Sequence, residues 1–215
     1  EGQGPDHSSG RIERYLQMCA QDNMLVAQPS TPASYFHLLR EHTYTRPRRP
    51  LIVFTPKQLL RLKAACSPVE DFTSGTFQPV IGETDDAVLA SARKQGVDRV
   101  LLCSGRVYYD LLAHRTKTGD TRTAIVRLEQ LYPLESSAIA EALAPFSGAE
   151  LVWVQDEPAN QGMWPYLALN LPTDLTGGVL PTLVSRPEAA APAVGTAGVH
   201  RAQQEEILRQ AFARH

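Results

Sequence analysis

Cysteine, net charge and long apolar runs are all scarce in this chain of 215 residues, and each scarcity argues against a class of function. The three cysteines lie far apart without a CxxC pair, so neither a disulfide framework nor a zinc site is predicted. A formal net charge of -2 gives no basic face for nucleic acid or an anionic membrane. No apolar run approaches the roughly 20 residues that cross a bilayer. We therefore expect a globular protein of a reducing compartment.

Several motifs that mark enzyme families are missing as well. The sequence contains no GxSxG nucleophile elbow, no HExxH zinc motif and no close cluster of metal ligands, so no metal-binding residues are predicted. Its Gly119-Asp120 step continues into Thr121-Arg122 and does not resemble a metal-diphosphate motif. The chain begins with Glu1 rather than Met and opens on a Gly-rich polar segment. We interpret it as a piece of a longer polypeptide.

The first sixty residues show an alternation of helix and strand patterns. Helical spacing predicts a helix over residues 11–19, capped by Ser8 or Ser9, and short apolar runs predict strands at 24–27 and 50–55. A second helix is predicted to begin at Thr31 or Pro32. Its apolar side is expected to consist of Tyr35, Phe36, Leu38 and Leu39.

A second α/β unit follows a segment in which the periodicity fades, from Ser67 to Asp86. Strands are predicted at 98–105, 123–128 and 150–155, separated by helices at 107–114 and 136–146, which favours a parallel sheet with right-handed crossovers. Residues 171–198 are predicted to be a loop across the surface, before a final helix at 199–213. The fold class is therefore α/β.

One candidate site is the polar segment from Gly2 to Ser9, which surrounds His7 just before the first predicted helix. Backbone amides and the positive end of a helix dipole would favour an anion there, such as a carboxylate. The alternative is a plain polar loop in which Asp6 and Ser8 cap the helix. The residues alone leave both interpretations open.

A second candidate site follows the predicted strand at 150–155. Open α/β sheets place their sites at the carboxyl edge of the strands, and this position holds the sequence DEPANQGMW. No nucleophile or histidine accompanies it, so an interface or sheet-edge role is favoured over catalysis. The residues proposed for that role are Glu157, Asn160, Gln161 and Trp164.

Six ordered segments carry a family resemblance that covers essentially the whole chain. They are EGQGPDHSSGRIERYLQMCAQDNM, PSTPASYFHLLR, RPLIVFTPKQLLR, CSGRVYYDLL, AIVRLEQLYPL and WVQDEPANQGMW. These segments closely resemble the last fifth of the 2-oxoglutarate dehydrogenase decarboxylating component, in its proteobacterial type. The resemblance implies the end of a transketolase-like pyrimidine-binding domain at 1–60, a linker at 61–90 and a transketolase C-terminal-like domain with a mainly parallel sheet at 91–215.

The resemblance also implies a reaction. Members use thiamin diphosphate and magnesium to decarboxylate 2-oxoglutarate oxidatively in the tricarboxylic acid cycle, and they transfer a succinyl group to a lipoyl-bearing succinyltransferase component. They work as homodimers, here expected in the bacterial cytoplasm. His7 falls at the family's active-site histidine, which binds or orients the 2-oxo acid. Gln3, Ser8 and Ser9 match the same motif and are expected to support that loop.

The resemblance limits what this chain is expected to do alone. The magnesium-diphosphate motif and the glutamate that activates the cofactor lie upstream in the family, so we expect no cofactor bound by this chain alone and no activity from it. Two alternatives stay open. The chain could be a non-catalytic dimerisation or partner-docking module, or the complete protein could be a 2-oxoglutarate decarboxylase or carboligase without a transferase partner.

Overall fold

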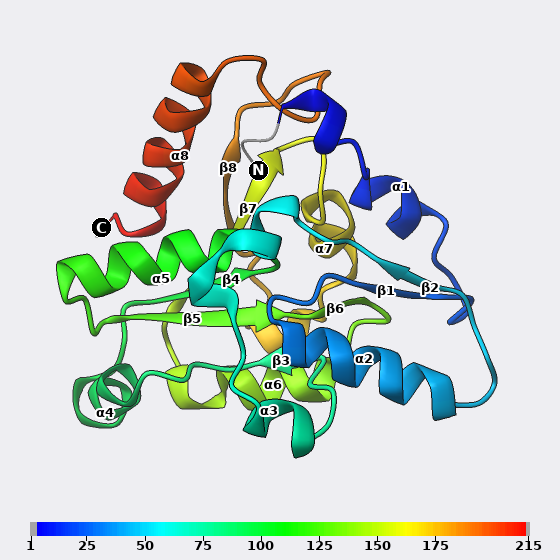
Figure 1. Cartoon of the computed structure of the whole chain (residues 1–215). Helices are drawn as coiled ribbons and strands as arrows, with labels where there is room; N and C mark the ends of the chain where they lie inside the picture. The colour runs from blue at the N-terminus through cyan, green and yellow to red at the C-terminus, as the bar shows by residue number, and fades with distance from the viewer. Residues whose placement is uncertain (1–3, 214–215) are drawn as a thin grey trace.

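The first part of the chain forms a small sheet that is completed by a strand from the second part. The computed structural model describes residues 4–213 (Figure 1). In the three-stranded sheet, β1 (Leu25–Ala27) lies between β2 (Leu51–Val53), which is parallel to it, and β6 (Gln130–Tyr132), which is antiparallel. Because β6 comes from far along the sequence, the two parts of the chain share a sheet.

A five-stranded sheet forms the centre of the second part, with the strand order β3-β5-β4-β7-β8. The strands β4 (Arg99–Cys103), β5 (Thr123–Leu128), β7 (Glu150–Pro158) and β8 (Thr182–Arg186) are parallel. Only the edge strand β3 (Val80–Ile81) is antiparallel within this sheet. The predicted fold class, α/β with a mainly parallel sheet, is confirmed.

The helices that accompany these strands vary from single 3-10 turns to four turns of α-helix. The α-helices are α1 (Ile12–Gln17), α2 (Pro32–Tyr44), α3 (Glu70–Thr73), α4 (Asp86–Gln95), α5 (Val107–Thr118), α6 (Ser136–Leu143), α7 (Trp164–Asn170) and α8 (Ala197–Ala211). The 3-10 turns are η1 (Pro5–His7), η2 (Lys57–Arg61), η3 (Lys63–Ala65), η4 (Ala144–Phe146) and η5 (Thr173–Thr176). No described helix has the length and apolar character needed to cross a membrane.

Strand β4 shows how the sheet is covered on both faces, because its successive side chains point in opposite directions. Leu101 and Cys103 pack in one apolar cluster with side chains of α5 and α8. Val100 and Leu102 pack in the other, with side chains of α4, α6 and α7. Ile12 and Leu16 of α1 and Val26 of β1 belong to that second cluster, so the first part of the chain shares a core with the second.

The predicted apolar side of α2 is wrong for three of its four residues. Leu38 is buried, but Tyr35, Phe36 and Leu39 are exposed. The face that packs inward carries Ala33, Ser34 and His37 in addition to Leu38. The cause is polar: the buried Glu129 carboxylate accepts a hydrogen bond from the Ser34 hydroxyl at 2.7 Å, so the inner face needs a small polar side chain.

Two further local predictions are corrected. The segment 171–198, predicted as a surface loop, contains β8, whose Val184 is buried beside β7. Pro and Gly residues on both sides hid this short strand. The predicted serine cap of the first helix is also wrong, because Arg11 occupies the N-cap with φ 60° and no side chain accepts a capping hydrogen bond.

Candidate functional site

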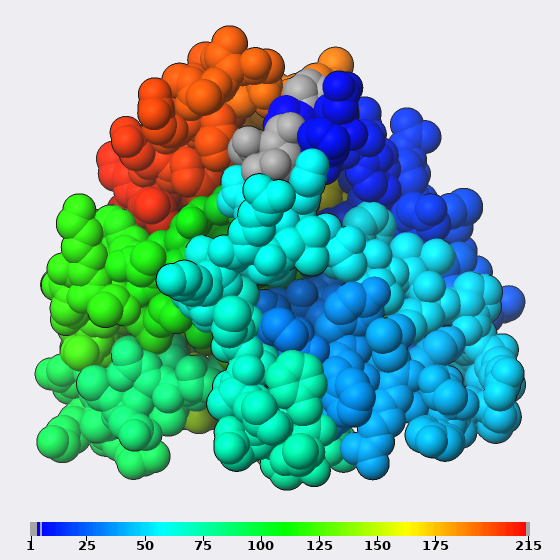
Figure 2. Space-filling view, in the orientation of Figure 1, coloured from blue at the N-terminus to red at the C-terminus, as the bar shows by residue number. Residues whose placement is uncertain are grey.

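His7 lies in the 3-10 turn η1, is exposed, and lines a cavity of about 340 Å³. Three parts of the chain meet at this cavity: the N-terminal loop with α1, the segment around β2, and the carboxyl edge of the large sheet. Figure 2 shows the N-terminal segment, in blue, beside the orange segment that precedes α8. The residues that line the cavity include His7, Ser8, Arg11, Glu13, Tyr15, Gln28, Phe54, Ser104, Arg106, Asp156, Glu157 and Gln161.

An arginine–aspartate pair lies at the sheet edge of the cavity. The Arg106 guanidinium donates to both carboxylate oxygens of Asp156, at 3.0 and 2.7 Å, and it also pairs with Asp110 at 2.7 Å. Burial raises the pKa of Asp156, but the charge and hydrogen bonds of Arg106, with a contribution from the charge of Arg186, lower this pKa to about 2. Asp156 is therefore ionised at neutral pH and fixes the guanidinium in a defined orientation.

Glu157, the next residue, has the opposite electrostatic character. Burial, together with the negative charges of Asp156 and Glu13, raises the pKa of its carboxyl to about 7. The two adjacent carboxyls thus differ in protonation near neutrality. Glu157 can hold a proton in a cavity that His7 also lines, and so can donate a hydrogen bond to an oxygen of a bound molecule.

The four residues proposed for the sheet edge divide into two pairs. Glu157 and Gln161 line the cavity, whereas Asn160 and Trp164 do not. The Asn160 side chain exchanges two hydrogen bonds with the backbone of Ala189, both at 3.1 Å. The Trp164 backbone N–H donates to the Gln155 side chain at 3.0 Å. Asn160 and Trp164 therefore build the turn, and Glu157 and Gln161 face the cavity.

The residues proposed to support the His7 loop also differ in position. Gln3 lies outside the described residues. Ser8 lines the cavity, and its Oγ is buried with no hydrogen-bond partner among residues 4–213. Ser9 is exposed and does not line the cavity. A buried hydroxyl without a partner is a place where a ligand or water can bind.

Sequence reasoning missed the contribution of the loop after β4. The Ser104 hydroxyl donates to the Gln28 side chain at 2.6 Å, and both residues line the cavity. Gly105, which has φ 62°, and Arg106 follow Ser104 in the same turn. The signal was present, since a Ser-Gly step directly after a buried strand marks a turn at the sheet edge.

The described residues do not supply the metal part of a thiamin diphosphate site. Among residues 4–213, no group of three or more His, Cys, Asp or Glu side chains is arranged to hold a metal ion. Of the acidic side chains that line the cavity, Asp156 is paired with Arg106, and Glu13 accepts a hydrogen bond from the backbone N–H of Gly162. The donor set here therefore does not fit a magnesium-diphosphate group by itself.

Comparison with known folds first defines the class. Residues 1–63 match the pyrimidine-binding domain of transketolase. A solved structure described as a split gene transketolase, inactive beta4 tetramer, superposes with a TM-score of 0.57, at 13% identity over 94% of this chain and 60% of that one. At this identity the likeness shows the fold alone. The chain is a transketolase-like α/β protein.

The second step identifies the family. Residues 66–212 match the 2-oxoglutarate dehydrogenase C-terminal family, and the chain belongs to it. The chain corresponds to the C-terminal portion of the E1 component of 2-oxoglutarate dehydrogenase.

Full-length relatives agree with this assignment. The chain is 48% identical over 214 residues to the 2-oxoglutarate dehydrogenase E1/E2 component of Corynebacterium glutamicum, covering 99% of this chain and 17% of that protein. It is 49% identical over 220 residues to the multifunctional 2-oxoglutarate metabolism enzyme of Mycobacterium sp. (strain JLS), again covering 99% and 17%. It is 47% identical over 215 residues to the E1 component of Cupriavidus necator, covering 100% and 22%. The chain thus spans about a fifth of its relatives, whose similar identities do not single out a proteobacterial type.

Proposed function

We propose that the complete protein containing this chain is a thiamin-diphosphate-dependent 2-oxoglutarate dehydrogenase E1 component, which decarboxylates 2-oxoglutarate oxidatively and passes a succinyl group to a lipoyl-bearing succinyltransferase. Membership of the family and the match over the whole chain support this proposal. The observation that carries it is the position of His7 on a cavity lined by both parts of the chain. That cavity would hold the 2-oxo acid or adjoin the site that holds it.

His7 is proposed as the residue that binds or orients the 2-oxo acid and its intermediates. Its imidazole can donate or accept a hydrogen bond toward a carboxylate or carbonyl oxygen. Ser8 offers a buried hydroxyl without a partner among the described residues. Gln3 and Ser9 are proposed to support the same loop.

Thiamin diphosphate supplies the nucleophilic carbon and the electron sink for decarboxylation when it is bound. The described residues do not fit its magnesium-diphosphate group, so we propose that other parts of the complete protein hold it. The isolated chain should then bind no cofactor and have no activity. What this chain contributes is the His7 loop, the Arg106–Asp156 pair and the Glu157 carboxyl at the cavity wall.

Partners and boundaries follow from the same proposal. We propose a homodimer in the bacterial cytoplasm, with a pyrimidine-binding part at 1–60, a linker at 61–90 and a C-terminal domain at 91–215. The relative in Corynebacterium glutamicum is described as an E1/E2 component, which supports a succinyltransferase partner for this protein.

The test is an assay of the complete protein with thiamin diphosphate, magnesium and 2-oxoglutarate. Release of carbon dioxide together with reductive succinylation of a lipoyl acceptor supports the dehydrogenase component. Carbon dioxide release without transfer would instead favour the decarboxylase or carboligase alternative, for which the description of one relative as multifunctional is the specific support. Absence of both reactions would leave a non-catalytic module.

A further inference from the structure

The His7 loop is weakly determined by its own sequence. It consists of the three-residue turn η1 and a short connection to α1, which has only 6 residues. Arg11, the N-cap of that helix, adopts the left-handed conformation with φ 60° and ψ 64°, which costs a non-glycine residue about 1 kcal/mol. No side chain caps the helix. Contacts from elsewhere must therefore hold the loop in place.

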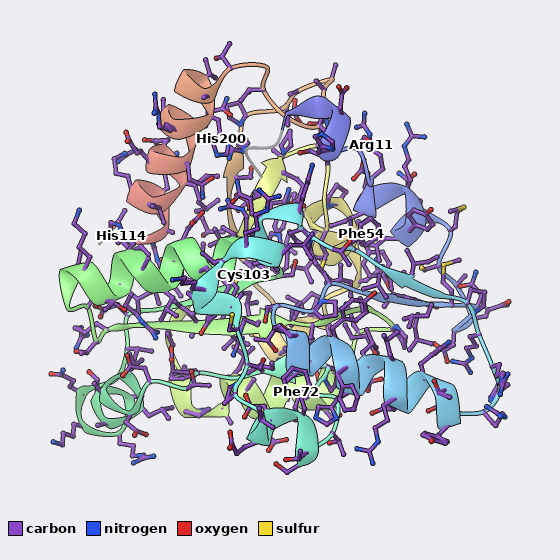
Figure 3. All side chains as sticks on the ribbon, viewed as in Figure 1. Arg11, Phe54, Phe72, Cys103, His114 and His200 are labelled. Carbon is purple, nitrogen blue, oxygen red and sulfur yellow. The ribbon has the colours of Figure 1, made fainter. Side chains whose placement is uncertain are left out.

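Two hydrogen bonds join the turn between β7 and α7 to this loop and to α1. The backbone N–H of Gly162 donates to Glu13 Oε2 at 2.9 Å in a buried position. Arg11 Nη1 donates to Gln161 Oε1 at 2.9 Å. Arg11 and Glu13 are themselves paired at 3.7 Å, so the two hydrogen bonds belong to one network. Figure 3 shows Arg11 directly after η1, next to the connection from β7 to α7.

The turn that provides these bonds is itself rigid. The Gln155 side chain is buried and accepts from Trp153 Nε1 at 2.9 Å, while its amide donates to the carbonyl oxygens of Pro158 and Gln161 at 3.0 and 2.8 Å. Gly162 has φ 71°, and a Cβ there would lie 2.9 Å from the Cβ of Glu157. A turn whose polar groups are hydrogen-bonded in this way is rigid, and it can hold a neighbouring loop in one position.

The same turn also holds a surface segment over the cavity. Gln161 is buried, and its amide donates to the carbonyl oxygens of Ala189 and Ala191 at 2.7 and 3.3 Å. Pro192, one residue further, lines the cavity with His7. Gln161 thus uses its oxygen for the His7 loop and its nitrogen for the Pro/Ala-rich segment, so it joins two walls of the cavity.

We propose that Glu13 and Gln161 are positioning residues, which lock the His7 loop onto the carboxyl edge of the large sheet and thereby fix where His7 stands on the cavity. Neither residue needs to touch the substrate. The catalytic consequence rests on the proposed function, whereas the positioning itself is a property of the fold. Supporting residues of this kind typically change activity by about 10- to 100-fold when they are removed.

The first experiment measures activity in the complete enzyme with a double-mutant design. Glu13→Ala and Gln161→Leu should each lower kcat for 2-oxoglutarate by about 10- to 100-fold, with thiamin diphosphate affinity unchanged. Glu13→Gln keeps an acceptor oxygen for Gly162 and should recover most of the rate. Gln17→Ala, an exposed position on the same helix, is the control and should leave kcat unchanged. In a His7→Ala background, Glu13→Ala should cause no further loss of kcat, because no imidazole is then left to position.

The second experiment measures hydrogen exchange of residues 4–11 in the same proteins. Exchange should become at least about tenfold faster in Glu13→Ala and Gln161→Leu and stay unchanged in Gln17→Ala. Should Glu13→Ala not fold, Glu13→Gln and Gln161→Leu decide the matter. The proposal is overturned by unchanged exchange, or by a full additional loss from Glu13→Ala in the His7→Ala background. If the wild-type enzyme does not act on 2-oxoglutarate, the proposed function fails. Hydrogen exchange alone then tests whether Glu13 and Gln161 position the His7 loop.

Discussion

The carboxylate of Glu129 accepts a hydrogen bond from the hydroxyl of Ser34 at 2.7 Å, although 95 positions separate the two residues in the sequence. The same oxygen accepts from the backbone N–H of Ser30 at 2.7 Å. Arg127 Nη1 donates to the Ser30 hydroxyl at 3.0 Å, and Tyr109 donates to the Ser30 carbonyl at 2.7 Å. This buried network joins the start of α2 to the strands of the second part.

Replacement of Glu129 by Ala should destabilise the chain by about 2–4 kcal/mol, because two buried donors would lose their acceptor. The measurement is the free energy of unfolding in urea. Glu141→Ala is the matched control, since Glu141 is exposed, and it should change stability by less than about 0.5 kcal/mol. Equal effects of the two substitutions would show that the Glu129 network contributes little.

Replacement of Gly105 by Ala should destabilise more than replacement of Gly119, although the two glycines have nearly the same φ, 62° and 65°. A Cβ at Gly105 would lie 2.7 Å from Gln28 Cδ, and Gln28 is buried, whereas a Cβ at Gly119 meets nothing within 4 Å. We expect a loss of about 1 kcal/mol at Gly119 from the backbone alone and about 2–3 kcal/mol at Gly105. Urea unfolding measures both, and equal losses would contradict the close contact.

The raised pKa of Glu157 predicts a pH-dependent stability. Folding raises this pKa from 4.5 to about 7, chiefly by burial, so the folded state holds the proton more tightly than the unfolded state. The stability that the protonated Glu157 carboxyl contributes to the folded state is complete below pH 4.5 and is lost as the pH rises through 7. Glu157→Gln cannot ionise, so its stability relative to wild type should increase by about 1–2 kcal/mol between pH 5 and pH 8. Unfolding at both pH values, with the exposed Glu141→Gln as control, tests this, and a constant difference would refute it.

The division of labour within the complete protein predicts a binding difference. Calorimetry should detect thiamin diphosphate with magnesium on the complete protein and no binding to this chain alone, because the acidic groups described here are not arranged around a metal ion. Tight binding by the isolated chain would show that the groups for the cofactor lie within it.

Some features of this fold could be predicted from local sequence, and others depend on contacts that the sequence does not display. Strand β4 was predictable because Val100 to Cys103 form an unbroken apolar run before a Gly turn. The inward face of α2 was not, because its orientation depends on a hydrogen bond from Ser34 to the distant Glu129. Glu129, which lies between β5 and β6 and close to the apolar residues Leu128 and Leu131, was the available clue.

The candidate site divides in the same way. The position of His7 before a helix and of Glu157 near the carboxyl end of a strand could be predicted from motif and strand pattern, although β7 extends to Pro158, beyond the predicted end at 155. Their meeting on one cavity could not, because the bond between Glu13 and Gly162 spans 149 positions. Nor could the opposite protonation of Asp156 and Glu157 be predicted, since it depends on Arg106 from another strand end.

The most direct test of the proposed function is the rate of carbon dioxide release from 2-oxoglutarate by the complete protein and its His7→Ala variant. We expect a loss of about 100-fold or more for His7→Ala, within the range for removing a positioned hydrogen-bonding group, with thiamin diphosphate affinity retained. His114→Ala, whose ring packs on Phe212 away from the cavity, should keep the wild-type rate. Equal rates for wild type and His7→Ala would contradict the central claim that this loop serves the active site.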